Sequence, residues 1–268
     1  MNPLVKAFYD PATHTISYVV YSLQDPACAV IDPVLDYVPS AESPSVTTAS
    51  AQLIVDFIKA QRLELHWILE THAHADHLSA AQWLKSQLGG KVAIGAGITT
   101  IQRHFVTILD DCEDVATDGR QFDQLLKEGD TLPCGALTVG VMHTPGHTPA
   151  CVSYRIGDAV FVGDTLFMPD YGTARTDFPG GDAHKLFRSI QRLLSLPDST
   201  RLFMCHDYPQ GREALWETTV LQQRQNNVLI RAGVSEEEFV QQRQARDIRL
   251  AAPALLIPSL QANIRGGL

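Results

Sequence analysis

The run THAHADH, residues 71–77, constrains this chain more than any other segment, because histidines and an aspartate crowd seven positions. It directly follows ELHWILE, whose apolar residues predict a buried strand. The run therefore lies in a loop at a strand end, where a rigid sheet can position side chains. His72, His74 and Asp76 occupy alternate positions and project to one side of an extended chain. His77 is expected to begin the next helix, and the whole arrangement is typical of metal ligands.

Three further candidate ligands each stand in a turn after a predicted strand: His147 in HTPGHTPA, Asp164 in FVGDTLF and His206 in MCHDYP. Taken singly, each is more often an ordinary turn or packed residue than a ligand. No cysteine lies near THAHADH in the sequence, and a set of nitrogen and oxygen donors favours a catalytic ion over a closed structural zinc site. The sequence therefore predicts a catalytic metal centre.

The order of elements predicts an αβ/βα four-layer sandwich, an α/β fold with two β-sheets flanked by helices. Strands followed by helices occur twice along the chain, and we expect one domain over residues 1–268 with a helical C-terminal part from about residue 212. Residues 33–46 predict a loop, after which Thr47 or Thr48 can cap a helix. The other expected helices run from Leu78 to Gly89, over 182–195, over 212–232 and, from the Ser235 and Glu238 capping pattern, over 235–247.

The net charge of −9 over 268 residues opposes a broad phosphate-binding surface, so nucleic acid is excluded as the expected partner. The five cysteines include no CxxC pair, which favours a reducing compartment. No segment resembles a signal peptide or the roughly 20 apolar residues that span a bilayer. We therefore expect a cytoplasmic protein that makes no contact with a membrane.

The arginines of the C-terminal third alternate with acidic residues, a pattern that predicts a solvated helix face. These arginines are Arg224, Arg231, Arg243, Arg246 and Arg249.

The motifs THAHADH, TPGHT, GDTLF and CHDY, in this order across residues 71–208, resemble the metallo-β-lactamase superfamily. The resemblance implies a metal in the cleft between two sheet edges. In the binuclear hydrolases of that superfamily, such as glyoxalase II, the matching residues hold two ions. One ion would be held by His72, His74, His147 and Asp164, and the other by Asp76, His77, His206 and Asp164. All these positions are filled here, so the ligand inventory leaves both one-metal and two-metal enzymes open.

The segment GDTLFMPDYGTARTDFPGGD, especially ARTDF, looks like the persulfide dioxygenase branch of the superfamily, in its bacterial form. This resemblance implies one Fe(II) per chain held by His72, His147 and Asp164, an oxygenase triad with an open face. The implied reaction uses O2 and water to oxidise glutathione persulfide to sulfite and glutathione. The other polar residues of the motifs, His74, Asp76, His77 and His206, would hold water and orient the ligands.

The same resemblance gives expectations for the residues around the metal. His206 and Tyr208 are expected to assist catalysis, although Tyr208 can also be a packed tyrosine. Arg175 can bind a carboxylate of glutathione or brace its loop through Asp177. Arg212 and Arg224 are further candidates for substrate contacts, against the alternative of surface ion pairs.

The resemblance also implies a homodimer. Cys151 and Cys205, which adjoin the motifs, are expected to be small buried residues. Two other functions stay open: a binuclear zinc thioester hydrolase of the glyoxalase II type, and a metal-binding module without turnover. Metal count and O2 dependence separate the dioxygenase from the hydrolase.

Overall fold

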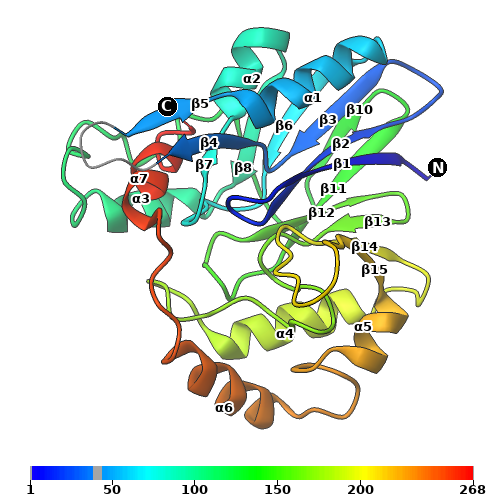
Figure 1. Cartoon of the computed structure of the whole chain (residues 1–268), viewed down its shortest axis with the longest axis vertical. Helices are drawn as coiled ribbons and strands as arrows, with labels where there is room; N and C mark the ends of the chain where they lie inside the picture. The colour runs from blue at the N-terminus through cyan, green and yellow to red at the C-terminus, as the bar shows by residue number, and fades with distance from the viewer. Residues whose placement is uncertain (1, 39–43, 268) are drawn as a thin grey trace.

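The computed structural model describes residues 2–38 and 44–267, in which two β-sheets face each other and helices cover their outer faces (Figure 1). The first sheet has the strand order β1 (Leu4–Asp10), β2 (Thr15–Tyr21), β3 (Ala27–Ile31), β6 (Glu64–Glu70), β8 (Lys91–Gly95) and β9 (Gln124–Leu126). The second has the order β10 (Thr131–Cys134), β11 (Leu137–His143), β12 (Val152–Ile156), β13 (Ala159–Phe161), β14 (Arg201–Phe203) and β15 (Glu217–Thr219).

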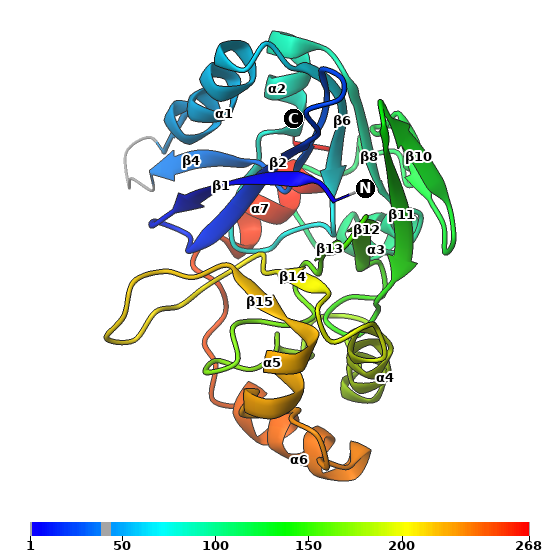
Figure 2. The ribbon, with the colours of Figure 1, turned by 90° about the vertical axis from the view of Figure 1, so that its right-hand side faces the viewer.

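The helices form the two outer layers (Figure 2). Against the first sheet lie α1 (Ala49–Ala60), α2 (Ala81–Leu88), α3 (Ile98–Phe105) and α7 (Leu256–Asn263). Against the second lie α4 (Ala183–Leu194), α5 (Val220–Asn226) and α6 (Glu236–Asp247).

Alternating side chains along the strands explain these layers. On β2, Ile16, Tyr18 and Val20 belong to the apolar core between the two sheets, whereas Val19 belongs to the core beneath the helices of the first sheet. A third apolar cluster joins the second sheet to α4, α5 and α6. Each helix layer and each sheet therefore buries its apolar face against a neighbour. The predicted αβ/βα four-layer sandwich is confirmed.

Part of the loop predicted over residues 33–46 is a strand instead. β4 (Val34–Val38) pairs with β5 (Ser45–Thr47) and β7 (Leu78–Ser79) in a third, small sheet. The apolar and β-branched side chains of VLDYV favour a strand, although prolines flank it; residues 39–43 of the predicted loop lie outside the described residues.

The start of α1 is also fixed by β4. Thr48 occupies the cap position as expected, but its side chain makes no capping hydrogen bond. The carboxylate of Asp36 instead accepts hydrogen bonds from Ser50 N at 3.0 Å and Ser50 Oγ at 2.5 Å. A strand residue distant in sequence thus supplies the polar group that the helix end requires.

The helix expected to begin at His77 or Leu78 begins at Ala81 instead. Leu78 and Ser79 pair with β4, so their backbone is extended. Ser79 Oγ then accepts a hydrogen bond from Ala81 N at 3.0 Å, which satisfies an amide of the first turn. The prediction missed this because the pairing partner lies over forty positions earlier in the chain.

The helix expected over 212–232 was too long, because Glu217–Thr219 pairs with β14 as strand β15. Helix α5 begins only after Thr219, which forms a capping box with Gln222. The helices predicted over 182–195 and 235–247 are confirmed as α4 and α6.

After α6 the chain crosses back to the first sheet through residues 248–255 and ends in α7 (Figure 1). Asn263 of α7 is buried, and its amide donates to His74 O and His77 O, both at 2.8 Å. Its carbonyl accepts from Ser79 N at 2.8 Å. Helix α7 therefore braces the THAHADH loop through Asn263. None of the helices in the described part of the chain has the length and apolar character needed to cross a membrane.

Candidate metal centre

Asp32, directly after β3, fixes the THAHADH loop to the first sheet. Its buried carboxylate accepts hydrogen bonds from Thr71 N at 2.7 Å, Thr71 Oγ1 at 2.9 Å and His74 Nε2 at 3.0 Å. Glu70 Oε2 lies 3.2 Å from the same His74 nitrogen. The ring of His74 is therefore held between two buried carboxylates.

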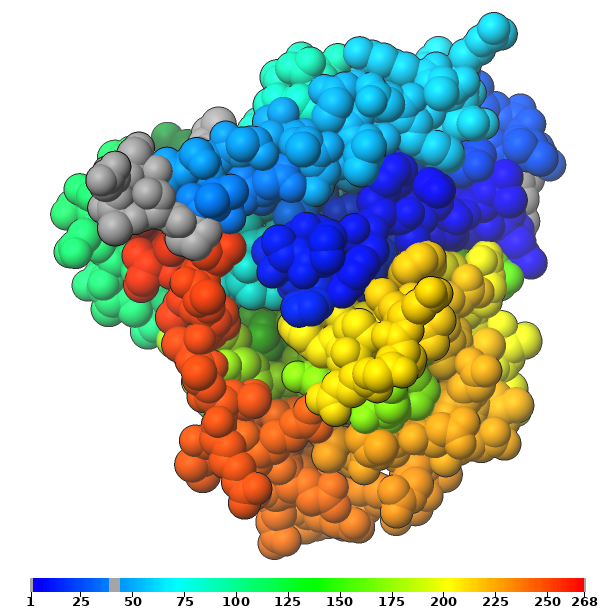
Figure 3. Space-filling model, in the orientation of Figure 1, coloured from blue at the N-terminus to red at the C-terminus, as the bar shows by residue number. Residues whose placement is uncertain are grey.

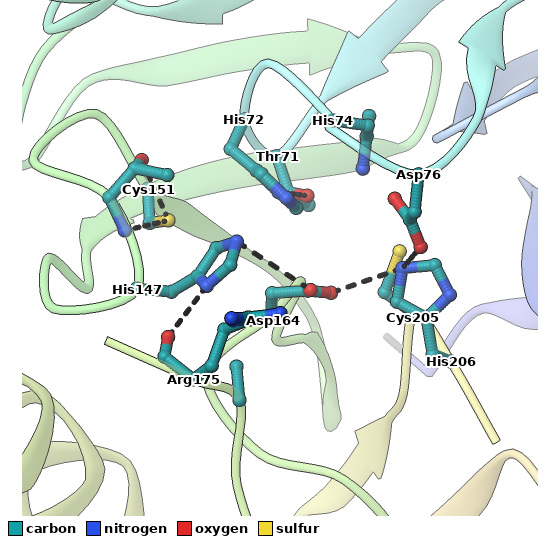
Figure 4. A network of polar contacts seen from close by, with 12 residues as sticks. Thr71, His72, His74, Asp76, His147, Cys151, Asp164, Arg175, Cys205 and His206 are labelled. Atoms are coloured by element: carbon teal, nitrogen blue, oxygen red, sulfur yellow. Dashed lines mark hydrogen bonds and ion pairs between the residues drawn. The ribbon is translucent and has the colours of Figure 1, made fainter. Parts of the chain in front are cut away.

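The predicted ligands meet where four strands of the two sheets end (Figure 4). His72, His147 and Asp164 form one set whose donor atoms all lie within 4.8 Å of one another. A second set with the same separation contains His74, Asp76, His77 and His206. The structure thus brings together every ligand position named from the sequence. Asp164 also groups with Cys205 and His206, so it joins the set of three to the set of four.

The donor atoms of this cluster fit a bound metal. The following atoms are buried and have no hydrogen-bond partner among the described residues: His72 Nε2, His74 Nδ1, His77 Nε2, Asp164 Oδ1 and His206 Nε2. Buried polar atoms are rarely left unpartnered. Imidazole nitrogens and carboxylate oxygens are donors that suit iron and zinc. The residues present therefore fit one or two metal ions.

Close approaches within the cluster do not amount to hydrogen bonds. His206 Nε2 lies 3.2 Å from Asp76 Oδ2 and 3.3 Å from Asp164 Oδ1, and His147 Nε2 lies 3.8 Å from Asp164 Oδ2. These atoms face one another across the space in which a shared ion would bind.

Burial and neighbouring charges set the protonation of the ligands. Burial, followed by the other histidines, holds the pKa of His72 well below its usual range. Burial also lowers the pKa of His77. Burial opposes ionisation of Asp76, but His206 and His77 lower the pKa of its carboxyl overall. Neutral imidazoles and an ionised carboxylate are the forms that bind metals.

His74 differs from the other histidines. Burial lowers its pKa, but Asp32 and Glu70 outweigh burial and raise the pKa well above its usual value. Nε2 of His74 therefore faces the two carboxylates, and Nδ1 is left as the atom that could bind a metal.

His147 is oriented by a backbone carbonyl. Its Nδ1 donates to Arg175 O at 2.8 Å, which leaves Nε2 directed toward Asp164. A second hydrogen bond of this kind commonly fixes the tautomer of a metal-binding histidine. The loop also needs Gly146, because a Cβ there would stand 2.3 Å from Leu186 Cα and 2.4 Å from Leu186 N.

Replacing Gly146 by alanine is expected to destabilise the protein by about 1–3 kcal/mol, because α4 or the His147 loop must move to accept the methyl group. Urea unfolding measures the loss of stability, and elemental analysis measures metal retention. Gly129→Ala is a matched control, since Gly129 also has a positive φ but nothing lies within 4 Å of its Cβ position. Equal losses in the two variants would contradict a steric role for Gly146.

A cavity of about 320 Å³ opens directly over the ligands Asp76, His147 and Asp164. Its volume falls in the range of small-molecule sites, about 300–1,000 Å³. Figure 3 shows the surface hollowed between the C-terminal segment, the first hairpin turn and the loop after β14. Further lining residues are aromatic or come from the segment after α6: Phe167, Tyr171, Phe178, Tyr208, Leu250, Ala251 and Leu255.

Tyr208 lies between the cavity and the metal ligands. Its ring stacks on His206 with centroids 5.9 Å apart and planes 19° apart, and it also lines the cavity. Burial, with the negative charges of Asp76 and Asp164, raises the pKa of Tyr208. Its hydroxyl therefore stays protonated and is available as a donor beside the ligands.

The predicted substrate-contacting arginines are engaged with other groups. Arg175 lines the cavity, but it forms two bonds of 2.6 and 2.7 Å with Asp177 and donates to Ala251 O at 2.7 Å. Arg212 pairs with two aspartates, and Arg224 pairs with Asp198. Neither Arg212 nor Arg224 is among the described residues that line the cavity. The geometry thus favours bracing by Arg175 and ion pairs for the other two.

Several residues that shape the site were missed from the sequence. Asp32, in AVIDP, and Asn263, far from any motif, were not among the residues named from the sequence. Cys151 and Cys205 are buried as predicted, and burial raises the pKa of Cys151 to about 12.

Comparison with known proteins places these observations in a family. A profile described as "Metallo-beta-lactamase superfamily" matches residues 10–206. A "Probable metallo-hydrolase" of Burkholderia pseudomallei is 51% identical, over 98% of this chain and 92% of its own length. A "Beta-lactamase hydrolase-like protein" of Agrobacterium fabrum is 49% identical, and this chain spans 61% of that longer protein. "Glyoxylase B2" of Dictyostelium discoideum is 44% identical over 98% of this chain and 90% of its own length.

More distant relatives carry another name. "Persulfide dioxygenase ETHE1, mitochondrial" of Homo sapiens is 29% identical over 98% of this chain and 89% of its own length. The crystal structure of ETHE1 from Myxococcus xanthus matches with a TM-score of 0.78 and 27% identity, over 99% of this chain and all of that one. Since the profile covers most of the chain and every predicted ligand from His72 to His206, the chain belongs to the metallo-β-lactamase superfamily.

Proposed function

We propose that this chain is a persulfide dioxygenase that converts glutathione persulfide, O2 and water to glutathione and sulfite with one Fe(II). The observation that carries the proposal is the set of His72, His147 and Asp164, whose donor atoms lie within 4.8 Å of one another. His74 groups instead with Asp76, His77 and His206. Asp32 and Glu70 hold its Nε2 and leave its Nδ1 without a partner. Two histidines and one carboxylate with open positions are the ligands typical of non-haem iron oxygenases.

The proposed reaction balances without a further reductant. The sulfur–sulfur bond breaks, the terminal sulfur loses four electrons, and O2 accepts them; water supplies the third oxygen of sulfite and two protons leave. Bound iron would supply the redox chemistry and the open positions for sulfur and O2. The end-to-end match with the Myxococcus xanthus structure supports this proposal further.

The chain's own residues would prepare the site for that reaction. Arg175 O holds the His147 ring in one orientation. Phe167 and Phe178 give the cavity apolar walls that exclude water. The protonated hydroxyl of Tyr208 can donate a hydrogen bond to the substrate in the cavity.

A binuclear thioester hydrolase of the glyoxalase II type is the second candidate. The set of His74, Asp76, His77 and His206 offers a place for a second ion. The names of the relatives that are 44% and 51% identical support this candidate better than the dioxygenase. Two metal ions would activate water for attack on a thioester carbonyl.

Metal content and O2 uptake test the two candidates together. We expect about one iron per chain, with O2 consumption and sulfite formation when glutathione persulfide is added. His206→Ala should then retain most of the iron, because His206 belongs to the set of four. Two metal ions per chain, hydrolysis of a glutathione thioester and no O2 uptake would instead establish the hydrolase.

A further inference from the structure

One arginine of the cavity has no carboxylate partner among the described residues. Arg246 lines the cavity and is half-buried. Its Nη1 donates to Tyr171 O at 3.0 Å, and its guanidinium lies over the Tyr171 ring, 4.7 Å from the centroid. Within residues 2–38 and 44–267, no ion pair joins Arg246 to an acidic group, and its other nitrogens make no hydrogen bond.

The two other arginines that line the cavity are already neutralised. Arg175 pairs with Asp177, and the buried Arg243 pairs with Asp247 at 2.7 Å. Asp247, the neighbour of Arg246 in sequence, has both carboxylate oxygens occupied. Oδ1 accepts from Arg243, and Oδ2 accepts from Thr176 N and Oγ1. Arg246 is therefore left as a cation whose free donors match a carboxylate from outside the chain.

The position of Arg246 suggests which end of a substrate it meets. The Tyr171 ring contacts the Tyr208 ring with centroids 4.8 Å apart and planes tilted by 32°, and Tyr208 stacks on His206 at 5.9 Å. Two aromatic rings thus separate Arg246 from a metal ligand along one wall of the cavity. The cavity has metal ligands at one end and an unpaired cation toward the other.

We propose that Arg246 binds a carboxylate of the substrate, and that the cavity selects thiol-derived substrates whose carboxylate lies remote from the reacting sulfur. This rests on the proposed function only in taking the ligand cluster as the reacting centre, and it holds for a persulfide or a thioester. Glutathione, which carries carboxylates at both ends, is the probe that this chemistry suggests.

Calorimetric binding of glutathione to the metal-loaded protein tests the proposal without turnover. Arg246→Gln should weaken glutathione binding about 10- to 100-fold, the range for a hydrogen bond between charged groups. The same change should alter binding of glutathione dimethyl ester by less than about 3-fold. Arg249→Gln is the matched control, because Arg249 is exposed on the same segment and does not line the cavity. Equal weakening for acid and ester, or none for the acid, would overturn the proposal.

Kinetics add a second readout. With glutathione persulfide, Arg246→Gln should raise KM about 10-fold or more with little change in kcat, and Arg246→Lys should restore part of the loss. With a carboxylate-free persulfide, such as that of cysteamine, KM should change little. If glutathione binding depends on Arg246 but no O2 is consumed, the dioxygenase fails while this inference stands. A fall in kcat for both persulfides would assign Arg246 to bracing of Tyr171 and overturn it.

Discussion

Replacing Asp164 by alanine is expected to lower kcat/KM by at least about 1,000-fold and to remove most of the bound metal. Asp164 belongs to the set with His72 and His147 and lies 3.3 Å from His206 of the other set. It is therefore a ligand in both the one-metal and the two-metal scheme. Mutating a group that only orients a ligand typically lowers metal affinity or activity about 10–100-fold. Mutating a ligand itself should lower them more.

Steady-state rates and elemental analysis of the purified variant measure these losses. Asp170→Ala is the control, because Asp170 lies on the same loop but pairs with Arg212 at the surface. Unfolding of chelator-treated wild type and Asp164→Ala protein should give similar midpoints, since the substitution leaves all three apolar cores intact. An Asp164→Ala protein that retains its full metal content would show that the cluster does not bind metal as described.

The candidate ligand positions could be placed from the sequence because each lies in the loop that follows a strand. Strand ends are positioned by the sheets, so short motifs there locate side chains in space as well as in sequence. THAHADH, His147, Asp164 and His206 therefore converge as expected. The order of strands and helices along the chain likewise predicted the four layers.

Features that depend on distant parts of the chain were missed. β4 was expected to be loop although VLDYV favours a strand, since its pairing with β7 joins positions over forty residues apart. The 212–232 helix was overextended because Glu217–Thr219 pairs with β14. The same limit explains Arg243. Its spacing among charged residues predicted a solvated helix face, but its side chain is 1% exposed in the structure. A buried charged residue on a helix can be distinguished from a solvated one only when its buried partner is known.

Asp247 is the buried partner of Arg243, and its replacement has the largest expected effect on stability. Asp247→Asn should reduce the free energy of unfolding by about 3–5 kcal/mol, as for other buried ion pairs that lose one member. Asp247 Oδ1 accepts from Arg243 Nε at 2.9 Å, and Oδ2 accepts from Thr176 N and Oγ1 at 3.0 Å. Arg243 Nη1 also donates to Thr173 O at 2.9 Å. The substitution leaves a buried cation without its counter-charge.

Urea unfolding measures this loss, and Asp118→Asn provides the control. The Asp118–Arg120 pair is also close, at 2.6 Å, but more than half of each side chain is exposed. Its loss should change stability by no more than about 1 kcal/mol. Equal effects of the two substitutions would show that burial does not strengthen the Arg243 pair.

Asp247→Asn should also weaken metal binding. Thr173 and Thr176 flank Arg175, whose carbonyl orients His147. Asp247 and Arg243 tie both threonines to α6. Loss of the ion pair between Asp247 and Arg243 therefore loosens the loop that orients His147. We therefore expect Asp247→Asn to bind metal more weakly at a temperature where it remains folded. The double variant Arg243→Met with Asp247→Leu should regain much of the stability, because no unpaired charge stays buried. It should not regain the metal affinity, because the hydrogen bonds to Thr173 and Thr176 are still missing. Full recovery of both stability and metal affinity would show that the Arg243–Asp247 pair does not support the metal site.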